Sequence, residues 1–179
     1  MASLKQQQVD AAEEFVSAAI DALKTERGIH VETAVAALAR MAGTFLFRSF
    51  DFPAAGIQPG QVVLSGNANE EGPRLVELLG GVLAHIGVVL DDGKLGGAPD
   101  PENQPDQTFV ETQKRLEPAF LKIKERHGLS PHEAAEAGAV ATALMIQQCA
   151  RALDPHIAFG VAVYGFIEGS KTAPDPVVL

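Results

Sequence analysis

The sequence predicts an all-α fold: a six-helix bundle built from two pseudo-symmetric three-helix repeats. Three observations support this prediction. Apolar residues recur at spacings of three and four, which is the period of an amphipathic helix. Capping signals open several of these segments, and glycines close most of them. A hairpin pattern in the first half of the chain also recurs in the second half at one fixed offset.

The repeat is most visible around Gly28 and Gly128, which stand 100 positions apart. Six residues are identical at this offset: Ala19, Lys24, Gly28, Ala34, Ala37 and Ala39 correspond to Ala119, Lys124, Gly128, Ala134, Ala137 and Ala139. Apolar positions stay in phase as well. We therefore expect the helix pairs 5–49 and 108–153 to superpose as copies, with Gly28 and Gly128 in equivalent turns.

The first repeat, residues 3–87, begins with two helices of different character. An S-x-x-Q capping box at Ser3 and Gln6 predicts an amphipathic helix that ends at Gly28. The next helix, about 31–49, is apolar on nearly every side. A helix of that kind belongs at the centre of a bundle.

A connector rich in proline and glycine occupies residues 51–72, and it predicts a turn region. The third helix is expected to run from Pro73 to about Ile86. The sixth, from Pro155 to Gly169, resembles it in being apolar nearly all round. We expect the second and fifth helices, which are rich in alanine and glycine, to form the central pair, with the third and sixth as outer layers.

The second repeat carries the clearest capping signals. Thr108 is expected to cap the fourth helix, which should kink or break at Pro118, because an interior proline removes a hydrogen bond and costs about 3 kcal/mol. Ser130 and Glu133 form a capping box for the fifth helix, with Pro131 at its first position.

The chain is expected to form a single domain over residues 1–179, since a length of this order buries enough surface for one core. The two repeats, 3–87 and 108–169, are separated by a linker at 91–107, where glycines and prolines alternate with Asp and Asn. The tail 170–179 carries prolines and is predicted to be disordered.

Composition narrows the function classes. The formal net charge of −9 argues against nucleic acid and anionic membrane surfaces as partners, because both attract Lys and Arg. The most apolar stretch, 157–167, is shorter than the roughly 20 residues that span a bilayer. The single cysteine, Cys149, forms no disulfide within the chain, and residues 1–8 lack the apolar run of a signal peptide. These features predict a cytoplasmic protein.

Arg40 and Arg48 interrupt the otherwise apolar second helix. A buried guanidinium must be paired, because its desolvation is costly. One interpretation is a structural ion pair with Glu77, Asp51 or Glu32, or an arginine that reaches the surface. The other is a ligand-binding site in which both arginines hold a carboxylate or phosphate. The corresponding positions of the second repeat carry no charge.

No pattern indicates a metal or cofactor. His132 and Glu136 share a helix face beside Glu133, but the second histidine of the H-E-x-x-H zinc motif is missing. Motifs for a nucleophilic serine, a phosphate loop or a dinucleotide are absent as well. We expect no metal site and no cofactor, and whether the protein is an enzyme stays open.

Two functional hypotheses follow. The first is a homo-oligomeric interaction or structural module, a homodimer, because two apolar outer helices need a cover. The alternative is a small-molecule (anion) binding protein or enzyme with a pocket between the repeats near Arg40 and Arg48.

Overall fold

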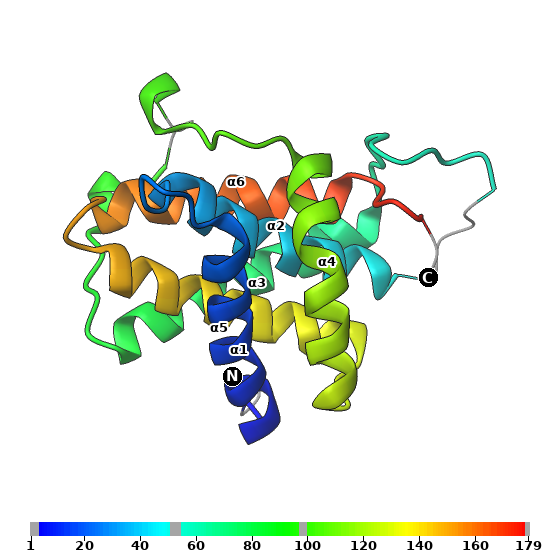
Figure 1. The fold of residues 1–179 in the computed structure, drawn as a ribbon, viewed down its shortest axis with the longest axis horizontal. Helices are drawn as coiled ribbons and strands as arrows, with labels where there is room; N and C mark the ends of the chain where they lie inside the picture. Colours follow the sequence, from blue (N-terminus) through cyan, green and yellow to red (C-terminus); the bar gives the residue numbers. More distant parts are fainter. Residues whose placement is uncertain (1–3, 51–54, 97–99, 178–179) are drawn as a thin grey trace.

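Six α-helices form the fold in the part of the chain that the structure, a computed structural model, describes: residues 4–50, 55–96 and 100–177 (Figure 1). In this part the only pairing of β type is two isolated bridges, so the all-α prediction is confirmed. The helices are α1 (Gln6–Leu23), α2 (Val31–Arg48), α3 (Gly66–His85), α4 (Phe109–Arg126), α5 (Pro131–Cys149) and α6 (Pro155–Lys171).

Helix α2 lies at the centre of the bundle, as the sequence predicts, and nearly all of its residues are buried. Its most extensive partner is α6, followed by α5, while α1 and α4 cross the bundle in front of them (Figure 1). The burial agrees with the expectation that α2 and α5 form the central pair, with α6 in an outer layer: α5 packs against α1, α2 and α3, whereas α6 leaves Tyr164 and Ile167 about half exposed. The structure adds that the closest packing of α2 is with this outer helix.

Glycines explain why α6 lies so close to α2. A Cβ added at Gly43 of α2 would lie 2.6 Å from the carbonyl oxygen of Phe166 and 2.8 Å from the Cα of Gly169. A Cβ at Gly165 would lie 2.7 Å from the Cβ of Ala39. Without side chains at these positions the two backbones approach directly, and the gain is dispersion energy along the whole contact.

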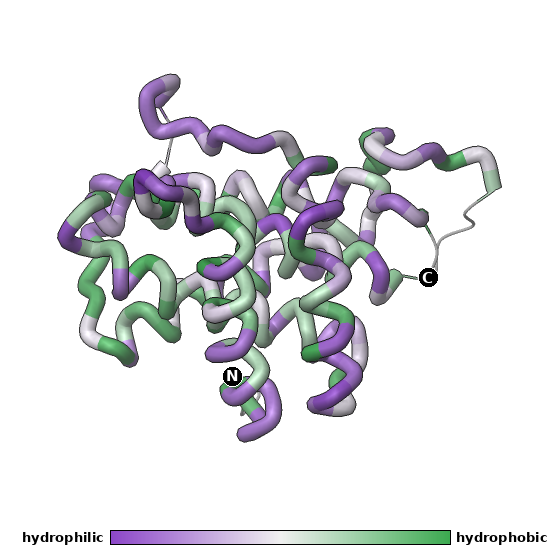
Figure 2. The backbone as a smooth tube through the Cα atoms, in the orientation of Figure 1, coloured by the Kyte–Doolittle hydropathy of each residue, from purple (hydrophilic) through white to green (hydrophobic). Residues whose placement is uncertain are grey.

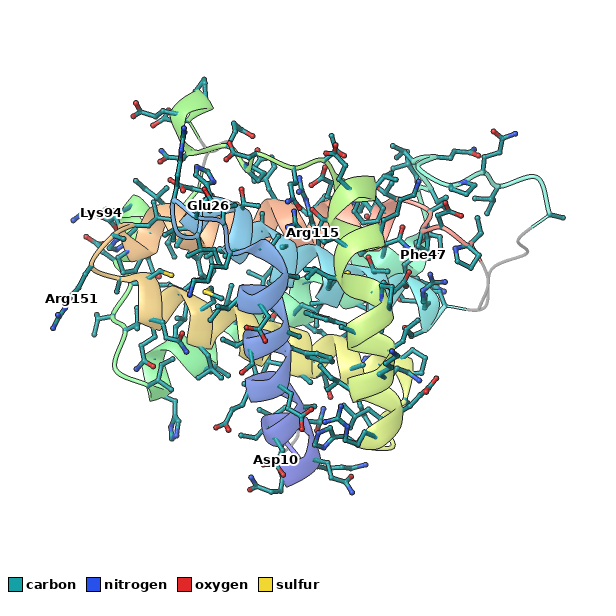
Figure 3. All side chains as sticks on the ribbon, viewed as in Figure 1. Asp10, Glu26, Phe47, Lys94, Arg115 and Arg151 are labelled. Atoms are coloured by element: carbon teal, nitrogen blue, oxygen red, sulfur yellow. The ribbon has the colours of Figure 1, made fainter. Side chains whose placement is uncertain are left out.

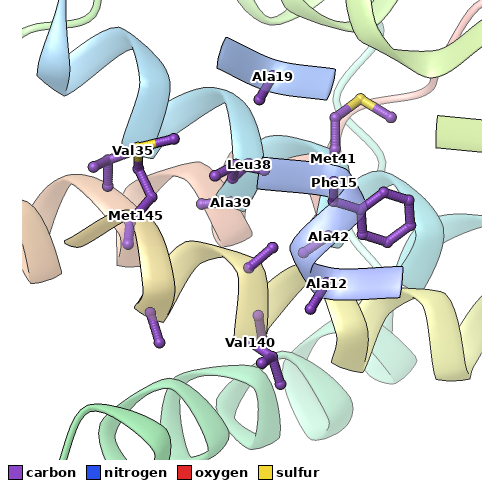
Figure 4. Close-up of a cluster of buried hydrophobic side chains, with 14 of the residues drawn as sticks. Ala12, Phe15, Ala19, Val35, Leu38, Ala39, Met41, Ala42, Val140 and Met145 are labelled. Carbon is purple, nitrogen blue, oxygen red and sulfur yellow. The ribbon is translucent and has the colours of Figure 1, made fainter. Parts of the chain in front are cut away.

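The core between the crossing helices is built on stacked aromatic rings. The rings of Phe15 and Phe120 have centroids 4.4 Å apart, and Phe45 lies 5.9 Å from Phe15. All three are at most 1% exposed. Figure 4 shows Phe15 of this cluster with Ala12 of α1 and Ala42 of α2 beside it. Hydrophilic residues recur along α1 and α4, which lie in front of this core (Figure 2).

The helix starts show which capping predictions hold. The side chains of Thr108 and Ser130 accept hydrogen bonds from the backbone of Glu111 and Glu133, so both predicted caps are confirmed. Helix α3 begins at Gly66 and not at Pro73, because Ser65 caps it by accepting a bond from the backbone N–H of Ala68 at 3.1 Å.

The start of α1 also differs from the prediction. It begins at Gln6, and the backbone N–H of Lys5 donates to the side chain of Gln8 at 2.9 Å. Ser3, the predicted cap, lies outside the described residues.

Pro118 does not interrupt α4, which runs as one helix from Phe109 to Arg126. The predicted break is therefore wrong, while the predicted kink stays a prediction. The carbonyl that loses its partner belongs to Lys114, one turn earlier, and both Lys114 and Pro118 are exposed. Water can hydrogen-bond to that carbonyl, so the helix continues.

The residues after α6 lie against the connector. The backbone N–H of Ala173 donates to the carbonyl of Gln61 at 2.9 Å, and Gly60 donates back to Ala173 at 2.8 Å. Ala173 is fully buried. The sequence predicts disorder for 170–179, whereas residues 171–175 take part in backbone pairing and side-chain contacts.

The division into two repeats stays a prediction, although Gly28 and Gly128 both adopt a positive φ in their turns, 102° and 63°.

Glu133 links α5 to the N-terminus of α1. Its carboxylate accepts from the backbone N–H of Ser130 at 2.8 Å and from Lys5 Nζ at 2.6 Å. The Lys5 hydrogen bond, followed by those from Ser130, lowers the pKa of Glu133 to about 2. Because this folded-state value lies below the ordinary 4.5, the stabilisation is complete above about pH 4.5 and disappears as the pH falls toward 2.

We expect Glu133→Gln to lower the free energy of unfolding by about 1 kcal/mol at pH 7, the usual contribution of a cap, because Lys5 is exposed and solvent weakens its ion pair. The difference in unfolding free energy between the variant and the unmodified protein should shrink as the pH falls from 5 to 2. Urea unfolding across this range measures it, with Glu125→Gln on the exposed side of α4 as the matched control. A deficit that does not change with pH would contradict the assignment.

Candidate functional site

Arg40 is held on three sides inside the bundle. The residue is 5% exposed. Its Nε donates to Glu168 Oε2 of α6 at 2.7 Å, and its Nη1 donates to the carbonyl oxygen of Gln107 at 2.7 Å and to Thr112 Oγ1 at 3.1 Å. The guanidinium is therefore fixed in position by α4, α6 and the segment before α4.

A hollow of about 320 Å³ opens beside Arg40. One side is formed by α2 and α6, with Ala36, Tyr164 and Glu168 among the lining residues, and the other by residues 103–105. This segment belongs to the hydrophilic stretch that leads over the top of the bundle to α4 (Figure 2). The volume falls in the lower part of the range for small-molecule sites.

Arg48 lies two turns further along α2 and has other partners. Its Nε donates to Glu117 Oε1 at 2.7 Å, and the side chains of both residues are at most 6% exposed. Gln113 Nε2 donates to the other oxygen of Glu117, and also to the carbonyl oxygen of Asp175 at 2.9 Å. The charge of Arg48 is thus compensated inside the protein, and the network ties α2, α4 and the chain after α6 together.

The structure places both predicted arginines in ion pairs, but with partners that the sequence did not suggest. Glu168 and Glu117 replace the expected Glu77, Asp51 and Glu32. Asp51 lies outside the described residues. The two arginines meet different groups, so they do not form one shared anion site.

A second hollow, of about 440 Å³, separates α3 from the outward side of α6. We call this surface the α3–α6 face, and its residues include Pro73, Val76, Glu77, Val163, Ile167 and Lys171. Ile167 is 46% exposed and its neighbour Tyr164 is 47% exposed, which is high for side chains of this size. Leu64, at 81%, lies in the connector that pairs with the end of α6.

Charge is distributed around the rest of the surface. Exposed side chains such as Asp10, Glu26, Lys94 and Arg151 extend from the ribbon into solvent (Figure 3). Within the described residues, no three His, Cys, Asp or Glu side chains are arranged to hold a metal ion. Nε2 of His132 lies 3.7 Å from Oε2 of Glu71, and its Nδ1 lies 3.9 Å from Oε1 of Glu136. In the same part of the chain, no helix combines the length and the hydropathy needed to cross a bilayer.

Comparison with known protein families, with curated proteins and with solved structures gives no match. The function must therefore be inferred from the residues of this chain.

Proposed function

We propose that this protein is a homo-oligomeric interaction module, and that two copies associate through the α3–α6 face. The observation that carries this proposal is an apolar hollow with opposite charges at its two ends. Exposed apolar surface of this kind is typical of association sites.

The direction of the helices sets the positions of these charges. Lys171, at the end of α6, donates to Asn69 near the start of α3 at 2.8 Å, so the two helices run antiparallel along the hollow. Glu77 lies further along α3 and lines the hollow with Val163. Lys171 therefore marks one end and the exposed Glu77 the other.

A two-fold axis across the hollow would reverse these ends in the second copy. Lys171 of each copy would then approach Glu77 of the other, and the projecting Ile167 would enter the hollow opposite. Such an isologous contact is self-complementary, as a dimer requires. We expect the dimer to bury at least roughly 1,200 Å², the lower bound of a specific interface.

Charge reversal tests this arrangement. Glu77→Lys and Lys171→Glu should each weaken the homodimer at least tenfold, because each variant creates two like-charge pairs, worth about 1 kcal/mol or more apiece relative to the original pairs. A mixture of the two variants should restore association, since every contact then again joins opposite charges. Light scattering and sedimentation of each variant and of the mixture measure these effects.

Glu26→Lys makes the same charge change in the turn between α1 and α2 and should leave association unchanged. Two results would overturn the proposal. One is a mass near 18.8 kDa for the unmodified protein at low micromolar concentration. The other is a mixture of the variants that associates no better than either variant alone.

We further infer that the α1–α2 and α4–α5 hairpins are copies of one ancestral unit, with a linker at 91–107 between the two repeats. The identical residues at the fixed offset and the positive φ of Gly28 and Gly128 support this inference. Superposition of the two hairpins tests it, and unrelated crossing angles would contradict it.

We also propose a cytoplasmic location. The single cysteine and the acidic composition of the chain support this proposal.

A further inference from the structure

We propose that the hollow beside Arg40 binds a small monocarboxylate with an apolar body, and that the ligand carboxylate takes the place of Glu168 on the Arg40 guanidinium. This site lies on the side of α6 toward α2 and residues 103–105, whereas the α3–α6 face lies toward α3, and Ile167 lines both hollows. Arg40 and Glu168 line only the first hollow, so this proposal is tested by other variants than the proposed self-association.

Arg40 is already oriented for this role. The bonds from Nη1 to Gln107 and Thr112 hold the plane of the guanidinium from the side of α4. Oε2 of Glu168 accepts a hydrogen bond from Nε. None of these hydrogen bonds between described residues uses Nη2. A carboxylate that accepts from Nε and Nη2 together would form the bidentate pair that arginine favours, which is stronger and more directional than a single bond.

Glu168 can leave this position more readily than Arg40 can. The Glu168 side chain is 44% exposed, whereas the Arg40 side chain is 6% exposed. An exposed carboxylate that turns into water loses little, because water solvates it again. A buried guanidinium without an anion would be strongly unfavourable. The site therefore always requires a carboxylate, and a ligand can supply it in place of Glu168.

The walls of the hollow suit an apolar body. Beside Arg40 and Glu168, the lining residues on the helical side are small or mainly apolar: Ala36, Val161, Tyr164, Gly165 and Ile167. Asn103 on the opposite side can form hydrogen bonds with polar substituents. A few polar groups in a mainly apolar pocket are typical of small-molecule sites. A phosphate would find a single arginine and little else to compensate its charge, so a carboxylate is the better match.

Tyr164 gives a direct measurement of binding. It is the only tyrosine in the chain, and the chain contains no tryptophan. Intrinsic fluorescence of the whole protein therefore reports on one wall of the hollow. We would titrate the protein with hexanoate, 4-methylpentanoate and cyclohexylacetate, each beside its neutral amide. We expect a saturable change for at least one acid below about 10 mM and none for its amide.

Glu168→Gln removes the competing carboxylate and should raise the affinity for that acid about fivefold. Glu77→Gln makes the same chemical change on the α3–α6 face and should leave the affinity unchanged. Arg40→Lys keeps the charge but loses the bidentate geometry, and should lower the affinity at least tenfold, with circular dichroism as the check on folding.

Three results would overturn the proposal. The first is the absence of a saturable change with all three acids in both the unmodified protein and Glu168→Gln. The second is equal binding of an acid and its amide. The third is an unchanged or lower affinity in Glu168→Gln, because a merely structural ion pair predicts no gain when Glu168 is neutralised.

Discussion

Gly169→Ala is expected to lower the free energy of unfolding by about 3 kcal/mol or more. An added Cβ would collide with the carbonyl oxygen of Arg40 and would lie 2.9 Å from both the Cα of Gly43 and the backbone nitrogen of Thr44. These are backbone atoms of α2, so no side chain can rotate away. Helix α2 also packs against α5, which limits its retreat. Overpacking of this kind costs about 1–3 kcal/mol, and more where backbones must separate.

Gly160→Ala is the matched control in the same helix. An added Cβ at this position meets no atom within 4 Å apart from the adjacent backbone of its own helix. Alanine has the better helix propensity, so this variant should be more stable than the unmodified protein by about 0.5–1 kcal/mol. Urea unfolding of both variants measures the contrast. Equal stabilities for Gly169→Ala and Gly160→Ala would show that the close contact between α2 and α6 does not exist in solution.

Glu117→Gln is expected to cost about 3 kcal/mol of unfolding free energy. The substitution keeps the shape of the side chain but removes the charge that compensates Arg48, whose side chain is 4% exposed. A buried pair that loses one partner leaves an uncompensated charge, at a cost of about 3–5 kcal/mol. Glu125→Gln, an exposed position of α4, should change the stability by less than about 0.5 kcal/mol.

The double variant Arg48→Met with Glu117→Met tests how Glu117 stabilises the protein. It distinguishes compensation of the Arg48 charge from packing of the side chain alone. Replacing both members of a buried ion pair by apolar residues of similar volume is often close to neutral. We expect the double variant to be more stable than Glu117→Gln alone. Chemical unfolding of the two proteins under the same conditions measures the difference. A double variant as unstable as the sum of its single substitutions would show that the two side chains contribute independently.

Local signals in the sequence were sufficient to predict features that depend only on neighbouring residues, such as helix caps. Ser130 and Thr108 cap α5 and α4 as predicted, because a cap depends on residues within one turn. Pro118 shows the limit of such reasoning. Its missing hydrogen bond is visible in the sequence, but its cost depends on whether the freed carbonyl meets water, and exposure is a property of the folded chain.

The arginines show the same division. The apolar surroundings of Arg40 and Arg48 are sufficient to predict that each must be paired. Their partners stand far away in the chain, at Glu168 and Glu117, and nothing in the local pattern distinguishes these carboxylates from the others.

The sequence by itself determined the all-α class, most helix boundaries, and the requirement that the buried arginines be compensated. Those properties follow from helix periodicity, capping and desolvation, which act over a few residues. Only the tertiary structure decided that α6 packs closest to α2, that a hollow opens beside Arg40, and that Lys171 and Glu77 stand at opposite ends of the α3–α6 face. These depend on the close fit of particular surfaces, such as Gly169 against Gly43, and a helical pattern shows which residues are small but not which helix they meet.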